Sequence, residues 1–281
     1  MVATNRIEVK KTYKLFINGA FPRSESGRVF EVHSKKGEFI ANPCLASRKD
    51  LRDSVTAARA AQHGWAKATA YNRGQILYRI AEMLEGRAEQ CAAEISATTA
   101  ITPLKAQSMV SEAIDRWVWY AGWSDKLSAV TGATNPVAGP YYNFTIPEPL
   151  GVVVVTASDS FIDFIDAIAA AVVSGNSVIA LVDGGLSVPA MTFAEMLATS
   201  DLPAGVINIL TGSLDELAPW AASHMDVDGF DISAIGKKKR AELKVAGAEN
   251  LKRIYIADGK LTPSRILAFM EQKTVWHTIG V

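Results

Sequence analysis

The sequence is short of the residue types on which most metal and redox sites depend. It contains two cysteines, Cys44 and Cys91, and four histidines in 281 residues. The two cysteines are too few and too far apart in sequence for a zinc site or a CxxC redox motif. We therefore expect no metal site, and the spacing allows a disulfide without indicating one.

The chain also lacks net charge and long apolar segments. Lys plus Arg and Asp plus Glu each number 29, so the charge gives no reason to expect nucleic acid or an anionic membrane as a partner. No apolar run approaches the about 20 residues needed to span a bilayer. The N-terminal stretch MVATNRIEVKK has no apolar region typical of a signal peptide. These absences predict a cytoplasmic protein.

A glycine-rich phosphate-binding loop is missing as well. Residues 148–161, EPLGVVVVTASDSF, predict a turn, a buried strand and then a loop, but the loop contains Ser158 and Ser160 in place of a glycine fingerprint. Asp183 ends the next predicted strand, where an acid can bind the ribose hydroxyls of a nucleotide. The same Asp183 is equally suited to a simple turn. We expect nucleotide binding at this edge to be absent or weak, with Asp183, Ser158 and Ser160 as the candidate cofactor contacts.

The second half of the chain has a regular alternation of apolar strands and helices. Helices are expected at 161–173, 189–198, 214–222 and 237–246, and strands at 152–155, 178–182, 206–210, 227–232 and 253–256. Continuously apolar strands separated by helices are typical of a parallel sheet that is covered on both faces. This pattern predicts an α/β fold, a doubly wound Rossmann-like parallel sheet of about five strands.

Four segments follow from these patterns. Residues 1–130 are expected to form a hairpin around Asn18-Gly19 and then helices, the first of them capped by Asp50. Residues 131–148 begin with Gly and Pro and continue with a β-prone stretch, which predicts a protruding β arm. The Rossmann-like core occupies 149–260, and residues 261–281 form a short helix and a tail strand. Cys91 lies on an apolar helical stripe and is interpreted as a core residue.

Several ordered motifs resemble the cofactor-binding half of the NAD(P)-dependent aldehyde dehydrogenase superfamily. They are EPLGVV at 148–153, SGNSVI at 174–179, LPAGVINILTG at 202–212 and ENLKRI at 249–254. LFINGAF at 15–21 resembles the N-terminal hairpin of the superfamily, and KTVW at 273–276 resembles its tail strand. The resemblance implies a dinucleotide-binding domain, a catalytic domain with a cysteine nucleophile and a glutamate base, and an oligomerisation arm.

The positions that carry chemistry in that superfamily are altered in this chain. The oxyanion-binding Asn position holds Ser160, after Ser158 and Asp159, and the best match to the general-base Glu is Ala257. The Lys and Glu that hold the adenosine ribose are replaced by Leu181 and Gly184. No cysteine follows Cys91. The resemblance therefore implies a truncated member that lacks the catalytic domain and is not active, with Ser160 and Ala257 as degenerate catalytic positions. It also implies weak or no NAD(P) binding, with Asp183, Ser158 and Ser160 as vestigial cofactor contacts.

The arm and the tail strand retain the residues that contact other subunits in the superfamily. The expected interface residues are Tyr141, Tyr142, Phe144, Ile146, Val275, Trp276 and Ile279. Unpaired strands expose backbone donors and apolar side chains, so their retention predicts a partner. We expect a full-length aldehyde dehydrogenase as the partner, in a hetero-oligomer formed by strand addition. The alternatives are an NAD(P)-dependent aldehyde oxidoreductase that is active only with a partner's catalytic domain, and a self-associating, homo-oligomeric ligand-binding module.

Overall fold

A five-stranded parallel sheet forms the centre of the computed structural model, which describes residues 9–280. The strand order is β7-β6-β5-β8-β9. The strands are β5 (Val152–Ala157), β6 (Ser177–Val182), β7 (Ile207–Thr211), β8 (Gly229–Asp231) and β9 (Arg253–Tyr255). The predicted doubly wound α/β fold is thereby confirmed.

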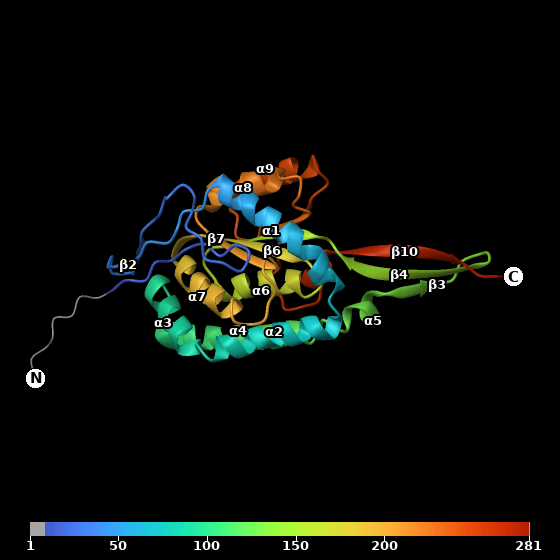
Figure 1. Cartoon of the computed structure of the whole chain (residues 1–281), viewed down its shortest axis with the longest axis horizontal. Helices are drawn as coiled ribbons and strands as arrows, with labels where there is room; N and C mark the ends of the chain where they lie inside the picture. The colour runs from blue at the N-terminus through green and yellow to red at the C-terminus, as the bar shows by residue number, and fades with distance from the viewer. Residues whose placement is uncertain (1–8, 281) are drawn as a thin grey trace, which may run out of the picture.

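Helices cover both faces of this sheet (Figure 1). On one face lie α1 (Arg48–Lys67), α8 (Leu214–Ser223) and α9 (Lys237–Ala248). On the other lie α6 (Phe161–Val172) and α7 (Ser187–Leu197), with an outer layer made of α2 (Ala70–Glu85), α3 (Ala88–Thr98) and α4 (Pro103–Ala121). The sheet therefore separates two apolar cores.

Side-chain alternation along β5 shows how one apolar strand serves both cores. Val153 and Val155 belong to the core that contains α6 and α7, whereas Val152 and Val154 belong to the core that contains α1 and α8. All four side chains are fully buried. This explains why the sequence of the strand is continuously apolar, since neither face meets water.

The N-terminal region confirms the predicted hairpin turn and corrects the predicted helix cap. Asn18 and Gly19 both have positive φ, as the predicted tight turn requires. Ile17 and Ala20 form the antiparallel bridge of the predicted hairpin, and Phe16 bridges to Ile209 of β7, so the hairpin also covers an edge of the sheet. The prediction of Asp50 as the cap of α1 was wrong. Ser47 is the N-cap and Asp50 is the third helical residue of a capping box.

Short elements complete this region and the turn after β6. They are the strand pair β1 (Val32–His33) and β2 (Phe39–Ala41) and the 3₁₀ turn η1 (Gly184–Leu186). The first eight residues of the predicted segment 1–130 lie outside the described residues.

A three-stranded antiparallel sheet projects from the body of the molecule (Figure 1). It consists of β3 (Ala133–Asn135), β4 (Tyr141–Pro149) and β10 (Met270–Thr278), in the order β10-β4-β3, and follows the short helix α5 (Leu127–Thr131). β10 pairs with β4 from Met270 opposite Pro149 to Thr278 opposite Tyr141. The tail strand is thus part of the arm.

The connection from β9 to β10 contains one short helix, α10 (Ser264–Leu267), which packs against α6. Ile266 and Phe269 at this connection are fully buried in the core that contains α6 and α7. Within residues 9–280, none of the helices is long and apolar enough to cross a membrane.

Candidate functional site

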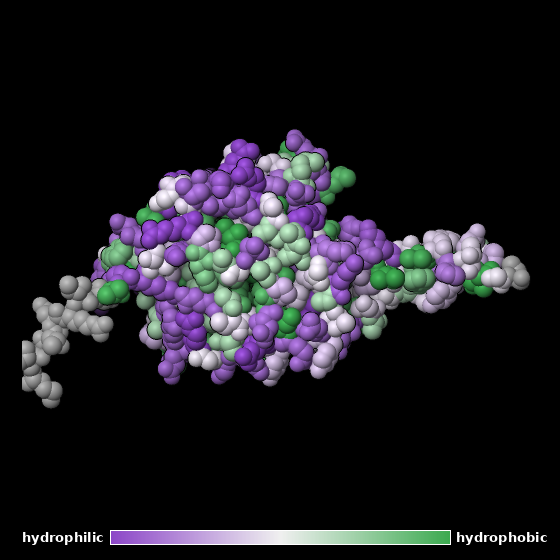
Figure 2. Space-filling model, viewed as in Figure 1, coloured by the Kyte–Doolittle hydropathy of each residue, from purple (hydrophilic) through white to green (hydrophobic). Residues whose placement is uncertain are grey.

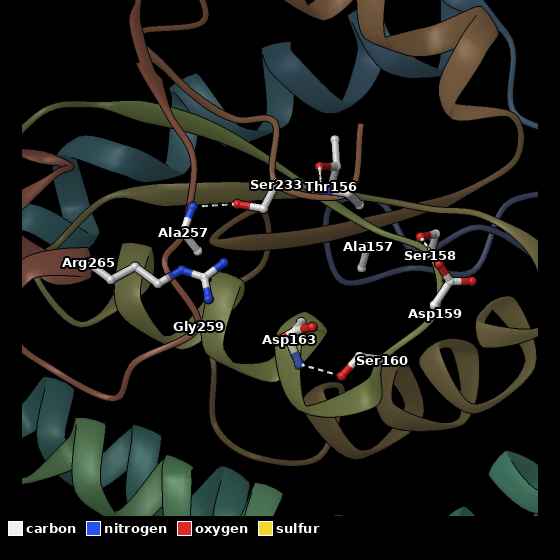
Figure 3. A pocket seen from close by; sticks show the side chains of 11 residues that line it. Thr156, Ala157, Ser158, Asp159, Ser160, Asp163, Ser233, Ala257, Gly259 and Arg265 are labelled. Carbon is white, nitrogen blue, oxygen red and sulfur yellow. Dashed lines mark hydrogen bonds between the residues drawn. The ribbon is translucent and has the colours of Figure 1, made fainter. Parts of the chain in front are cut away.

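A polar cleft of about 320 Å³ lies at the carboxyl ends of β5, β8 and β9 (Figure 3). The chain runs outward from β5 through β6 to β7 and then returns to the opposite side of β5 with β8. This reversal of strand order is the topological switch point, where open α/β sheets bind their ligands. The lining residues are Thr156, Ala157, Ser158, Asp159, Ser160, Asp163, Ser233, Ala234, Ala257, Gly259 and Arg265.

The loop after β5 brings the predicted residues Ser158 and Ser160 to this cleft. Ser160 is the N-cap of α6, and its Oγ accepts a hydrogen bond of 3.2 Å from the backbone N–H of Asp163. Ser158 Oγ lies 3.0 Å from Asp159 Oδ2, to which it donates. Hydroxyl and carboxylate groups thus form one wall of the cleft.

A hydrogen-bonded network around Asp231 forms the floor between β8 and β9. Asp231 is fully buried at the end of β8, and its Oδ1 accepts hydrogen bonds from the backbone N–H and from the hydroxyl of Ser233. Ser233 Oγ in turn accepts from the backbone N–H of Ala257 at 2.8 Å. Ala257, the predicted degenerate base position, therefore contributes its backbone to this network.

Arg265 reaches the same network from α10. Its Nη2 lies 2.8 Å from Asp231 Oδ2, and the two side chains are 6% and 0% exposed. Burial alone would lower the pKa of Arg265, but the adjacent Asp231 raises it above its usual value, so the guanidinium stays charged. Arg265 Nε is buried without a hydrogen-bond partner among the described residues. This position therefore holds a fixed positive charge with unused donor capacity.

Asp183, the third predicted cofactor contact, is not among the residues that line the cleft. Its Oδ1 accepts from the backbone N–H of Gly184 at 2.6 Å, and its Oδ2 accepts from that of Leu214 at 3.3 Å. A Cβ on Gly185 would lie 2.1 Å from the carbonyl oxygen of Thr98. The carboxylate of Asp183 thus caps a turn that is closely packed against the end of α3.

Both cysteines lie away from the cleft and are buried. Cys91 packs within the core between α3 and its neighbours, and burial raises the pKa of its thiol to about 12. A nucleophilic cysteine needs the opposite, a pKa low enough to populate the thiolate. Residues 9–280 contain no group of three or more His, Cys, Asp or Glu side chains placed to hold a metal ion.

The sequence analysis did not identify Arg265, Asp163 and Asp231 as site residues. The signal for Asp231 was available, because a carboxylate at the end of an otherwise apolar strand in an α/β sheet points to the ligand edge. Arg265 had no such signal. Its role depends on where the short helix α10 packs, which periodicity does not specify.

The sequence matches the model of the aldehyde dehydrogenase family over residues 21–271. Among curated relatives, retinal dehydrogenase 2 of Gallus gallus is 31% identical over 272 residues, which is 94% of this chain and 52% of that protein. Cytosolic 10-formyltetrahydrofolate dehydrogenase of Mus musculus is 29% identical over 276 residues, or 95% of this chain and 30% of that protein. The chain thus spans about half, or less, of the length of these relatives.

Solved structures of aldehyde dehydrogenases share the fold of this chain. The NAD-dependent aldehyde dehydrogenase of Sinorhizobium meliloti superposes with a TM-score of 0.80 at 25% identity, over 88% of this chain and 50% of that one. An aldehyde dehydrogenase of Bacillus cereus, solved as its NAD⁺ complex, gives a TM-score of 0.81 at 24% identity over the same shares. With a family match over residues 21–271, which is most of its length, this chain belongs to the aldehyde dehydrogenase family.

Proposed function

We propose that this chain is a catalytically inactive aldehyde dehydrogenase-like subunit, cytoplasmic and with weak or no NAD(P) binding, that docks through its arm onto a full-length aldehyde dehydrogenase. Its role is structural or regulatory. The observation that carries the proposal is an apolar face on the arm that no other described part of the chain covers.

This arm face is built from alternate residues of β4 and from their partner on β10. Tyr142, Phe144 and Ile146 point to one side of β4, and Val275 joins them because it pairs with Phe144. Tyr142 is 50% exposed and Val275 is 38% exposed. Figure 2 shows apolar residues at the surface of the arm. Lys273 and His277 flank this apolar centre, as a polar rim flanks the centre of a protein interface.

The opposite face of the arm carries two of the other predicted interface residues, Tyr141 and Trp276. Tyr141 and Trp276 are in edge-to-face contact, with ring centroids 5.8 Å apart. Trp276 is 59% exposed, although large aromatic side chains generally gain stability from burial. Ile279 lies just beyond β10, where its backbone N–H donates to the carbonyl of Pro140 at 2.8 Å.

β10 is also an edge strand. Its only strand partner among the described residues is β4, so the backbone groups on its other edge are available for pairing with another chain. Proteins without a partner usually protect such an edge with short strands, charges or proline. Glu271 and Lys273 supply such charges near the start of β10, but residues 274–278 contain no Asp, Glu, Lys, Arg or Pro, which favours strand addition along this stretch as the docking mode.

Inactivity is supported by the chemistry of the cleft. A missing general base costs about 10²–10⁴-fold in rate, and a missing oxyanion donor about 10²–10³-fold. Ala257 has no titratable side chain, and both cysteines are buried outside the cleft. The covalent route through a thiol therefore has no residue to carry it in this chain.

Docking is tested by co-expression with a full-length aldehyde dehydrogenase from the same organism, followed by size-exclusion chromatography with light scattering. We expect one mixed species, which Val275→Lys on the arm disrupts. Val245→Lys is the matched control, since Val245 is an exposed valine on α9, remote in the fold from the arm. A stable symmetric dimer of this chain alone, unaffected by the full-length protein, would contradict the proposal and favour the homo-oligomer.

Activity is tested separately by NADH formation with a panel of aldehydes. The chain alone should give no signal above background, and calorimetry should show no micromolar affinity for NAD⁺. If the mixed species oxidises aldehydes faster than the full-length enzyme does by itself, the alternative of an oxidoreductase that needs a partner's catalytic domain is favoured instead.

A further inference from the structure

The cleft carries one positive and two negative side chains on different walls. Arg265 enters from α10 on one side, whereas Asp159 and Asp163 come from the loop after β5 and from the first turn of α6 (Figure 3). Asp159 and Asp163 are both exposed, so they can change partners without disturbing the core. The cleft is therefore polarised along its length.

The positive wall is a built feature of the fold. The Arg265 side chain is about 95% buried, lines the cleft and is oriented by Asp231 through its Nη2. Its Nε has no hydrogen-bond partner among the residues of the structure, although buried donors are normally paired. A guanidinium has five N–H donors and binds carboxylates with directional hydrogen bonds. Because Nε itself is shielded from solvent, an incoming carboxylate would contact the guanidinium through its terminal NH₂ groups, which point into the cleft (Figure 3).

The negative wall disfavours large anionic ligands. Asp159 and Asp163 face the space in which a phosphate or pyrophosphate would have to lie, and like charges at short range are repulsive. The hydroxyl of Ser158 lies beside Asp159 and adds acceptor capacity at the same end. An ammonium group, which has three donors and one positive charge, matches this end of the cleft.

We propose that the cleft binds a small zwitterion, an amino carboxylate whose carboxylate contacts Arg265 and whose ammonium group lies between Asp159 and Asp163. The volume of about 320 Å³ is at the small end of the range for ligand sites and suits such a molecule. This site is separate from the arm, so it does not depend on docking to a partner.

The test is a titration of the whole chain by calorimetry with unbranched ω-amino acids of increasing length, from glycine to 6-aminohexanoate. One or two adjacent lengths should bind best, because the carboxylate must reach Arg265 while the ammonium group reaches the two aspartates. The n-alkylamine and the n-alkanoate of the best length, which each lack one charge, should bind at least about tenfold more weakly, as expected for loss of a charge-assisted contact. The proposal would be overturned if all lengths bind equally well, or if the n-alkylamine binds as well as the zwitterion. It would also be overturned if every amino acid of the series has a dissociation constant above about 10 mM.

Variants separate the cleft from general charge effects. Asp159→Asn and Asp163→Asn should each weaken the best zwitterion about tenfold and leave the thermal unfolding midpoint nearly unchanged, since both side chains are exposed. Asp115→Asn is the control, because it removes the same charge from an exposed position of α4 that does not line the cleft. If all three variants bind the zwitterion equally well, the assignment of the ammonium site is wrong.

Discussion

The central sheet and the arm use similar residues in opposite ways. β5 and β6 are strands in which every residue is buried, because helices cover both faces of the sheet. β4 and β10 also contain valine, isoleucine and aromatic residues, yet the larger part of these strands is exposed or half-exposed. The apolar side chains of β5 and β6 are buried against other parts of the same chain, whereas most of those on the arm remain exposed or half-exposed.

This difference separates apolar residues that stabilise the fold from apolar residues that do not. An apolar residue that is buried on folding contributes stability through area removed from water, about 25 cal/mol for each Å². The same residue on the arm contributes little to the stability of the isolated chain. A concentration of exposed apolar residues on both faces of one projecting element indicates an interaction surface. The arm is therefore better explained by a partner than by the fold.

The largest expected effect contrasts one aromatic residue from each region. Phe164→Ala removes a fully buried ring from α6 and should lower the free energy of unfolding by about 3–5 kcal/mol, through lost burial and the cavity left behind. Tyr142→Ala on the arm should lower it by about 1 kcal/mol or less in the isolated chain. Urea unfolding of both variants measures the two values. Similar losses at the two sites would mean that the arm is a stabilising part of the fold.

The second prediction concerns the buried ion pair between Asp231 and Arg265 and its contribution to the stability of the sheet domain. Asp231→Ala leaves the Arg265 guanidinium buried without its counter-charge, and the expected loss is about 3–5 kcal/mol. The double variant Asp231→Ala with Arg265→Met should recover part of that loss, because no unpaired charge remains. A double variant as unstable as Asp231→Ala would show that packing, and not the isolated charge, causes the loss.

A pH-dependent effect is expected from Asp166 on α6. Burial raises the pKa of its carboxyl from 3.8 to about 6, although Arg116 and Arg265 act in the opposite direction. The folded state therefore binds this proton more tightly than the unfolded chain does, so the contribution to stability is present below pH 4 and is lost as the pH rises to about 6. The loss corresponds to about 3 kcal/mol at most.

Asp166→Asn removes this titrating group, so the variant is the reference against which the pH dependence of the wild-type protein is measured. Urea unfolding at several pH values measures the free energy of unfolding of both proteins. Relative to Asp166→Asn, the wild-type protein should become less stable as the pH rises from 4 to 6. A difference that does not change over this interval would show that the carboxyl titrates as it does in the unfolded chain.

A smaller effect is expected at the turn after β6. Gly185→Ala places a methyl group against the backbone of Thr98 and should cost about 1–3 kcal/mol, because backbone does not yield easily. Gly184 has φ +62° with no atom near its missing Cβ, so Gly184→Ala should cost about 1 kcal/mol from strain alone. Thermal unfolding of the two variants gives the comparison, and a larger cost at Gly184 would contradict the close packing against α3.

Much of the sheet was predictable from the sequence, because burial on two faces leaves an unmistakable apolar run such as the one in β5. The turn at Asn18-Gly19 and the arm strand β4 were predictable for similarly local reasons. The cap of α1 was not, since Asp50 and Ser47 are both good capping residues and only the geometry decides between them. In the cleft, Ser158 and Ser160 followed from their place after a strand, while Arg265 depends on a tertiary contact of α10 that has no local signature.

The most direct test of the account is hydrogen–deuterium exchange of β10 and β4, with the chain alone and then with a full-length aldehyde dehydrogenase added. The edge amides of β10 should exchange rapidly in the isolated chain and become protected on addition of the full-length protein, while the amides of β5 and β6 should be protected in both states. Edge amides that are already protected in the chain alone, or that stay exposed after the addition, would contradict it.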